Sequence, residues 1–313
     1  SLKTNEMLIE VSKEEYRKHF STDSSPFITE QFVELVENKQ DKILRLMKDD
    51  NPSIGLLAGT KDGIMRSPFS APFGGFHYKY EHMLLRVVYV FISELKDYIS
   101  KNGLKQLYIT LPPNLYQASM NAKLVNAFIS LGFTMETPDI NNWINLKEFN
   151  GEWVKSVVLQ NYRKAMKHGL TWCEVSCRSE MEEAYRVIRR NREEKGRDIY
   201  MTLDDLLKVK EIFPVEFFII RDKNAKCVGA GIFYRGHENI VQCIFLGDDM
   251  ENRSLGVMNL MYINCYNYYK KLGFDYIDMG ASSLRGEPNS GLIRFKELHN
   301  CVTSLRYTFT WKS

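Results

Sequence analysis

An acidic pair, Asp248 and Asp249, directly follows a stretch that we expect to form a strand over residues 240–246. A carboxylate at the end of a strand can accept a proton in catalysis, which makes Asp248 and Asp249 candidate general bases. The structural alternative is a solvated loop, in which acidic pairs are common.

A turn that could bind an anion comes next. Arg253, Ser254 and Gly256 precede a helix expected from about Val257 to Leu272. Backbone N–H groups at the start of a helix can bind phosphate. In the alternative interpretation Ser254 is simply an N-cap and Gly256 a first-turn residue.

A second candidate site lies in the segment SPFSAPFGGF, residues 67–76. Its glycines would let a ligand approach the backbone, and its rings could bury an apolar or sugar face. The alternative is a tight crossover beneath the apolar helix expected over 82–102. The candidate substrate-binding residues are Ser67, Phe69, Phe73, Gly74 and Gly75.

Positive charge gathers in residues 186–197, RVIRRNREEKGR, within a basic and mainly helical stretch expected over 151–215. These side chains could bind the phosphates of a nucleotide-linked acceptor or of RNA. Glu193 and Glu194 favour the alternative of a solvated helix face with local ion pairs.

Composition excludes several classes of protein. A chain of 313 residues is long enough for two domains, and its net charge of +3 identifies no partner. None of the six cysteines forms a CxxC pair, which predicts reduced thiols in a cytoplasmic protein without a metal site. No run reaches the ~18 apolar residues of a membrane span, and the start lacks a signal peptide's apolar stretch. Sequence motifs of kinases, zincins, serine hydrolases and dinucleotide enzymes are absent.

The elements that must position these residues follow from apolar periodicity and turn signals. In the first half we expect a helix over 29–48, a hairpin of 54–58 with 64–67, the helix over 82–102 and a strand over 104–111. In the second half we expect a hairpin of 217–221 with 227–234, the strand and helix named above, a strand over 276–279, a short helix over 291–299 and one closing strand over 301–311.

One sequence pattern occurs twice, about half the chain apart. Residues 97–109 (DYISKNGLKQLYI) and 267–279 (NYYKKLGFDYIDM) both resemble a helix end, a glycine at its exit and a short apolar strand. The repeat predicts two related α/β domains with mixed sheets, 1–150 and 151–313, packed side by side.

The element order and three motifs resemble the Gcn5-related N-acyltransferases, in tandem as in the Fem family of peptidoglycan-bridge aminoacyltransferases and their acyltransferase-like relatives. The motifs are SPFSAPFGGF, NYRKAMKHGL (161–170) and GLIRFKELHN (291–300). The resemblance implies transfer of an acyl or aminoacyl group from a thioester or ester to a small-molecule or peptidyl amine, such as a cell-wall precursor. It also implies that the second domain binds the donor and that the first recognises the acceptor.

Site residues follow from the same resemblance. Acyltransferases of this fold hold the pyrophosphate of acetyl-coenzyme A, or another acyl-coenzyme A, in an R/Q-x-x-G-x-G/A loop that opens the central helix. This chain matches at Arg253 and Gly256 and departs at Met258, which is larger than the residue the loop expects. The implied cofactor-binding residues are Phe245, Leu246, Gly247, Arg253, Ser254, Leu255, Gly256 and Val257.

Lys296 lies in the Phe-Lys motif, where related enzymes place a functional lysine. It would pair with a donor phosphate or stabilise an oxyanion, and the alternative is a surface lysine on a short helix. The strand 240–246 would polarise the donor carbonyl where it bulges or splays. Asp248 and Lys296 are therefore the candidate catalytic residues.

Two alternatives stay open. Met258, and the lack of an anion loop in the first half, also fit a binding or scaffold protein that has lost the donor site. The basic stretch also fits a transferase that uses aminoacyl-tRNA. Fem enzymes that act on tRNA often carry a long coiled-coil arm, and residues 178–212 are too short for one, which disfavours a nucleic-acid partner.

Overall fold

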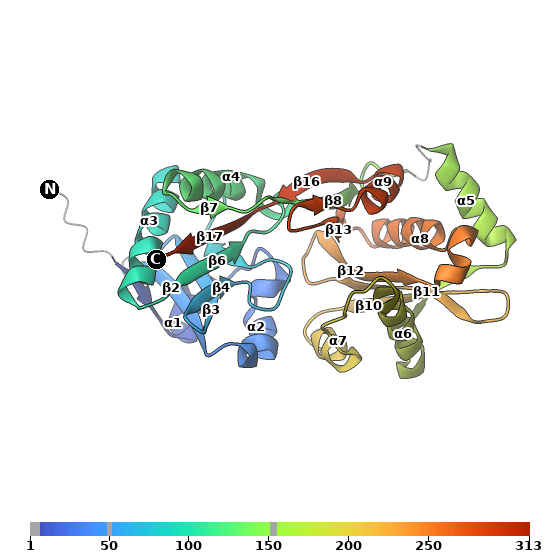
Figure 1. The fold of residues 1–313 in the computed structure, drawn as a ribbon, viewed down its shortest axis with the longest axis horizontal. Coiled ribbons are helices and arrows are strands. Elements are labelled where there is room, and N and C mark those ends of the chain that lie inside the picture. The colour runs from blue at the N-terminus through green and yellow to red at the C-terminus, as the bar shows by residue number, and fades with distance from the viewer. Residues whose placement is uncertain (1–6, 49–51, 151–154) are drawn as a thin grey trace. The chain divides into compact units, whose positions relative to one another are not determined.

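The computed structural model describes residues 7–48, 52–150 and 155–313, which fold into two compact units (Figure 1). Unit 1 contains the chain up to Ile140 together with Ser283–Glu287 and Ser304–Ser313, and unit 2 contains Asn141–Ser282 and Pro288–Thr303. The last residues of the chain, Ser304–Ser313, thus belong to the first unit. A division at residue 150 alone would place them in the second. No helix within the described ranges is long and apolar enough to cross a bilayer.

Unit 1 is a mixed sheet in the order β1-β2-β3-β4-β6-β17-β7, with β5 also paired to β3. Helices α3 and α4 cover one face, and α1 and α2 cover the other (Figure 1). The elements are β1 (Leu8–Glu10), α1 (Lys13–His19), η1 (Pro26–Ile28), α2 (Glu30–Val36), η2 (Glu37–Lys39), β2 (Lys42–Lys48), β3 (Ile54–Lys61), β4 (Ile64–Ser67), β5 (Gly75–Tyr78), α3 (Leu85–Lys101), β6 (Gln106–Thr110), α4 (Asn114–Ser130), β7 (Thr134–Met135) and β17 (Thr308–Lys312).

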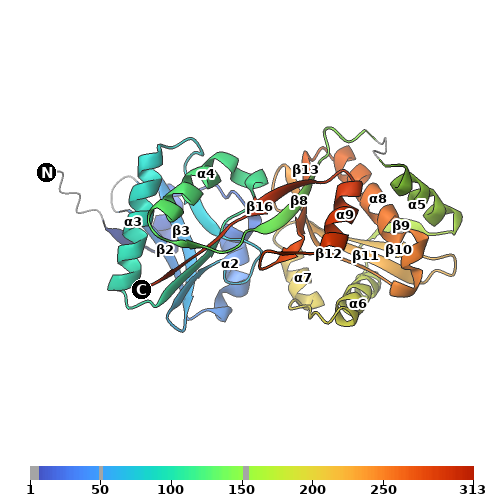
Figure 2. The ribbon, with the colours of Figure 1, turned by 45° about the horizontal axis from the view of Figure 1, so that its top comes forward.

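Unit 2 is a second mixed sheet, in the order β16-β8-β13-β12-β11-β10-β9. Helix α8 packs on one face, and α6 and α7 lie on the other (Figures 1 and 2). The elements are β8 (Asp139–Asn145), α5 (Ser156–Lys167), β9 (Thr171–Val175), α6 (Arg178–Glu194), α7 (Leu203–Lys210), β10 (Val215–Arg221), β11 (Cys227–Tyr234), β12 (Ile240–Asp248), η3 (Met250–Leu255), α8 (Val257–Lys271), β13 (Tyr276–Ala281), α9 (Ser290–Leu298) and β16 (Val302–Arg306). A separate two-stranded sheet joins β14 (Ser283–Leu284) and β15 (Glu287–Pro288).

The central strands are buried on both faces. In β3, Leu56 and Ala58 pack into the core beneath α3 and α4, whereas Leu57 packs with Val33 of α2. In β11 every residue from Cys227 to Tyr234 is buried. Such strands appear in the sequence as continuous apolar runs, because neither side of the strand faces water.

Two of the expected elements were wrong. The helix expected over 29–48 ends early, because residues 42–48 form β2, which pairs with β1 and β3. The apolar residues Ile43 and Met47 fit a helical spacing, but they lie on a strand buried on both sides. The single closing strand expected over 301–311 is instead two strands, β16 and β17, which belong to different sheets.

The repeat is confirmed in three dimensions. Helix α3 is followed by β6, which pairs in parallel with β4, and α8 is followed by β13, which pairs in parallel with β12. Gly103 and Gly273, at the exits of the two helices, both have positive φ, +67° and +91°. The chain therefore contains the same helix–strand crossover once in each unit.

Candidate functional site

Strand β12 separates from β13 partway along its length. The two pair in parallel only over Ile240–Gln242 and Tyr276–Asp278, yet β12 runs on to Asp248. Residues Cys243–Leu246, just past this point, are half-exposed although β12 is the middle strand of its sheet. The divergence therefore exposes the part of β12 that β13 would otherwise cover.

A β-bulge lies at the same place. Opposite β11, Phe233 pairs with Cys243 and Ile232 pairs with Phe245, which leaves Ile244 as an extra residue. A bulge re-aims the backbone and takes the extra residue out of the regular ladder. The sequence-based expectation of a bulged or splayed strand beside the central helix is confirmed here.

Unit 1 repeats this arrangement with a larger departure. Strand β4 pairs with β6 as far as Ser67, and β5 resumes pairing with β3 at Gly75. The intervening residues 68–74 leave the sheet at the position that corresponds to the bulge of β12. The segment proposed as a substrate site thus occupies the equivalent point of the first repeat.

Ser67 and Gly74 stabilise the loop formed by residues 68–74. The Ser67 hydroxyl donates to the Leu57 carbonyl at 2.7 Å and accepts from the Gly75 N–H at 2.9 Å. A Cβ at Gly74 would lie 2.6 Å from the Pro68 nitrogen, so glycine is needed for the loop to close on itself. These residues have a structural role whether or not a ligand binds.

The two aromatic side chains of the segment pack against unit 1. Phe73 is buried between the rings of Phe27 and Tyr116, at centroid distances of 5.1 and 5.0 Å. Phe69 packs against the small cluster of Ile28, Val33 and Leu57. A cavity lined in part by Ser67, Phe69 and Gly74 measures only ≈ 10 Å³. That is about the space of one water molecule, far less than a substrate needs.

Asp248 and Arg253, predicted as base and anion ligand, are partners of each other. Arg253 donates to Asp248 Oδ1 at 2.8 Å and to Oδ2 at 3.0 Å. Asn191 of α6 also donates to Oδ1 and to the Asp248 carbonyl, each at 3.0 Å. Asp248 is 5% exposed. The carboxylate is therefore buried and already bonded to two side chains.

Glycine is needed at position 256 for a structural reason. Its φ is +82°, and a Cβ there would lie 2.4 Å from the backbone oxygen of Asn161 on α5. The close approach that glycine allows is taken by α5 and not left open for a ligand. Val257, which follows, is fully buried in the core, whereas Ser254 is exposed and makes no capping bond to α8.

Lys296 is buried on α9 rather than at the surface. It is 3% exposed, and its ammonium donates to the Met279 carbonyl at 2.9 Å and to the Ser282 hydroxyl at 2.8 Å. A third, longer contact of 3.5 Å reaches the Gly280 carbonyl. Burial lowers the pKa of Lys296, and it has no ion-pair partner in the described part of the chain. Lys296 thus fixes β13 beyond its separation from β12.

In the sequence Arg192 is one of the cations of residues 186–197 that could bind phosphates, and nothing there distinguishes it from the others. Its guanidinium lies over the ring of Phe245, 5.0 Å from the ring centre, on the diverging part of β12. Gly247, on the same strand, lets α6 approach closely, because a Cβ there would lie 2.8 Å from Ile188. Phe245 and Gly247 are thus contacted by α6, and Leu246 packs against the core.

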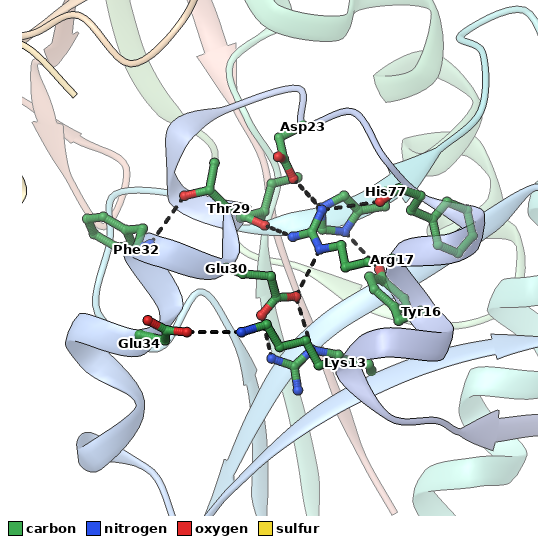
Figure 3. Close-up of polar contacts among 12 residues, drawn as sticks. Lys13, Tyr16, Arg17, Asp23, Thr29, Glu30, Phe32, Glu34 and His77 are labelled. Atoms are coloured by element: carbon green, nitrogen blue, oxygen red, sulfur yellow. Dashed lines mark hydrogen bonds and ion pairs between the residues drawn. The ribbon is translucent and has the colours of Figure 1, made fainter. Parts of the chain in front are cut away.

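A second polar network lies in unit 1 (Figure 3). Tyr16 hydrogen-bonds to His77 Nδ1 at 2.8 Å, and His77 Nε2 lies 2.8 Å from Asp23. Arg17 joins Asp23 to Glu30, at 2.8 and 2.9 Å. Burial lowers the pKa of His77, so the ring is neutral and Nε2–H donates to ionised Asp23. Because Tyr16 and His77 are wholly buried, this network ties α1 to β5 rather than meeting a substrate.

Comparison with solved structures identifies the fold. A structure called FemX matches with a TM-score of 0.66 at 11% identity, covering 98% of this chain and 97% of that one. L-PGS from Bacillus licheniformis matches with 0.61 at 11% identity, covering 92% and 93%. A tandem GNAT protein from the clavulanic acid biosynthesis pathway matches with 0.58 at 9% identity, covering 98% of both chains.

No protein-family profile matches the sequence, and no curated protein is similar to it in sequence. The structural likeness therefore establishes the architecture: two tandem Gcn5-related N-acyltransferase folds, similar in structure to FemX. It confirms the expected α/β fold class with mixed sheets.

Proposed function

We propose that unit 2 transfers an acyl or aminoacyl group from an ester or thioester donor to an amine. The observation that carries this proposal is the opening between β12 and β13, with the bulge at Ile244 beside it. Acyl transfer needs N–H donors aimed at the oxygen where negative charge develops. A bulge in an otherwise paired strand supplies such a donor without disturbing the rest of the sheet.

In the proposed reaction the amine attacks the donor carbonyl directly. The carbonyl oxygen accepts a hydrogen bond at the bulge, the new C–N bond forms, and the ester or thioester bond breaks. The proton lost by the amine passes to the departing oxygen or sulfur through water, because Asp248 is already bonded to Arg253 and Asn191. Although Cys243 is half-exposed as a residue, desolvation of its thiol raises the pKa to about 12, so the thiol stays protonated and is a poor nucleophile.

The donor class within this proposal is acyl-coenzyme A or an aminoacyl ester, and the acceptor is a small-molecule or peptidyl amine, with a cell-wall precursor as one instance. The packing of Asn161 against Gly256 favours a donor that is not anchored by pyrophosphate at that glycine. The same observation, with the Arg253–Asp248 pair, favours a second candidate: a binding protein that retains the fold without catalysis.

The test offers acetyl-coenzyme A or a 3′-aminoacyl adenosine as donor and a lysine-containing peptide as acceptor, with product detected by mass. Ile244→Pro removes the bulge N–H at a position where proline is tolerated, and Ile244→Ala is the matched control. We expect the proline variant to lose 10²–10³-fold in rate and the alanine variant little. An equal rate in a folded proline variant would refute the role of the bulge. No product and no thermal stabilisation with either donor would support the binding protein.

A further inference from the structure

Helix α6 ends in a turn that gathers three cations. Gly196 has a φ of +69°, and the N–H of Arg197 bonds back to the Arg192 carbonyl at 2.8 Å. This is the geometry of a glycine-terminated helix end, and it folds Arg197 back over the last turn. Arg192, Lys195 and Arg197 therefore lie on one turn of chain beside the diverging part of β12.

The cations of α6 divide into two groups. Arg189 pairs with Glu193 at 3.3 Å and Arg190 pairs with Glu194 at 3.1 Å, one helical turn apart. Across residues 7–48, 52–150 and 155–313, by contrast, Arg192, Lys195 and Arg197 form no ion pair, and the buried Nε of Arg192 has no hydrogen-bond partner. The Glu pairing expected from the sequence thus neutralises only the outer face of the helix.

The nearby carboxylate of Asp248 does not neutralise the positive charge of these three residues. Asp248 raises the pKa of Lys195, but both of its oxygens are already bonded to Arg253. Lys195 is exposed as a residue, but partial desolvation of its ammonium, and then the charge of Arg253, lower its pKa. Burial, and then the charge of Arg197, lower the pKa of Arg192. Each of these shifts means that the protonated form is disfavoured in the protein as it stands, and a bound anion would relieve it.

The helix dipole is not a sufficient explanation. Cations at a helix C-terminus gain a modest stabilisation from the dipole while they remain solvated. That gain does not require Arg192 to be half-buried with its guanidinium over the ring of Phe245. An arginine without a carboxylate partner keeps its N–H donors for other acceptors, and a guanidinium binds phosphate oxygens in a fork.

We propose that Arg192, Lys195 and Arg197 form a binding site for the phosphate or pyrophosphate group of a small-molecule substrate. Phe245 places this site at the edge of the opening between β12 and β13, so the group bound there would anchor a donor or acceptor for transfer. Its part in catalysis rests on the proposed function, whereas anion binding does not. RNA is disfavoured because the paired arginines leave no extended basic face along α6.

The experiment is calorimetric titration of the full chain with inorganic pyrophosphate and a nucleoside diphosphate at low salt, with a single-stranded RNA as the second arm. The variants are Arg192→Met and Lys195→Met, and the matched control is Arg190→Met, which removes a paired arginine from the same helix. We expect at least tenfold weaker pyrophosphate binding in the first two and unchanged binding in the control. We also expect affinity to fall with added salt.

Stability separates a binding role from a structural one. Arg192→Met keeps an apolar stem over Phe245 and removes an unpaired, half-buried charge, so we expect its melting temperature to equal or exceed that of the wild type. A marked loss of stability, absence of pyrophosphate binding at 10 mM, or equal loss in Arg190→Met would overturn the site. Tighter binding of RNA than of the diphosphate would overturn the small-molecule assignment. Pyrophosphate binding without any transfer activity would leave the site standing and refute only the enzyme proposal.

Discussion

Arg253 donates two hydrogen bonds to Asp248, at 2.8 and 3.0 Å, in a side-by-side ion pair at the end of β12. Two residues for which the sequence predicts separate roles are therefore bonded to each other. We expect Asp248→Asn to lower the free energy of unfolding by roughly 1–2 kcal/mol, a modest value because Arg253 is 46% exposed.

The same variant discriminates between a positioning role and general-base catalysis. If Asp248 only holds Arg253 and α6, transfer activity in Asp248→Asn should fall less than tenfold. A loss of 10²–10⁴-fold with intact stability would instead identify a base. Urea unfolding and a rate assay on the same preparation provide the two readings, and Arg253→Gln is the companion variant.

Gly256 should be more sensitive to alanine than Gly273. Both glycines have positive φ, +82° and +91°, so alanine strains the backbone at either position. Only at Gly256 would the new Cβ also meet a backbone atom, Asn161 O at 2.4 Å, while nothing lies within 4 Å at Gly273. We expect Gly256→Ala to cost about 1–3 kcal/mol more than Gly273→Ala in denaturant unfolding. Equal costs would mean that α5 does not press on this turn.

His299 should make unit 2 sensitive to acid. Burial lowers its pKa to about 4, and its Nδ1–H donates to the Phe295 carbonyl at 2.6 Å. The unfolded histidine titrates near 6.5, so between about pH 6.5 and 4 the unfolded state binds more protons. The stabilisation is complete above about pH 6.5 and is lost as the pH falls toward 4.

The matched variant for this prediction is His299→Gln, which cannot titrate. Comparing the free energy of unfolding of both proteins from pH 7 to pH 4, we expect the wild type to lose roughly 3 kcal/mol more than the variant. Parallel curves for the two proteins would show that His299 is not the responsible group.

Lys296→Met should loosen the end of β13. The variant removes the ammonium that bonds the Met279 carbonyl and the Ser282 hydroxyl and leaves both without that donor. We expect a loss of about 1–3 kcal/mol in the free energy of unfolding. Lys271→Met, at an exposed position on α8, is the control and should stay within about 0.5 kcal/mol of the wild type.

Much of the architecture was predictable from local sequence. The repeated helix–glycine–strand phrase located α3 with β6 and α8 with β13, because apolar periodicity and glycine exits are local signals. The helix expected over 29–48 failed where β2 begins, since a strand buried on both faces lacks the alternation that distinguishes it from a helix. The split of the closing strand at Tyr307 depends on sheet pairing, which is not local.

The candidate site was less predictable. The motif residues Arg253 and Gly256 were identified by spacing, but their partners Asp248 and Asn161 are set by tertiary packing. Lys296 was expected to bind a phosphate or an oxyanion, or to lie at the surface, yet its hydrogen bonds are to the end of β13. The position of Arg192 over Phe245 joins residues on different elements, and no spacing in the sequence reveals it.

The bulge itself can be observed in solution. We would titrate ¹⁵N-labelled protein with acetyl-coenzyme A and, separately, with a non-hydrolysable aminoacyl adenosine, and follow the backbone amides by NMR. If unit 2 binds the donor carbonyl where β12 leaves β13, the amides of Ile244 and Phe245 should shift downfield with one of these donors, and those of Gly74 and Gly75 should not. Saturable binding that leaves the Ile244 and Phe245 amides unchanged would contradict the proposed site.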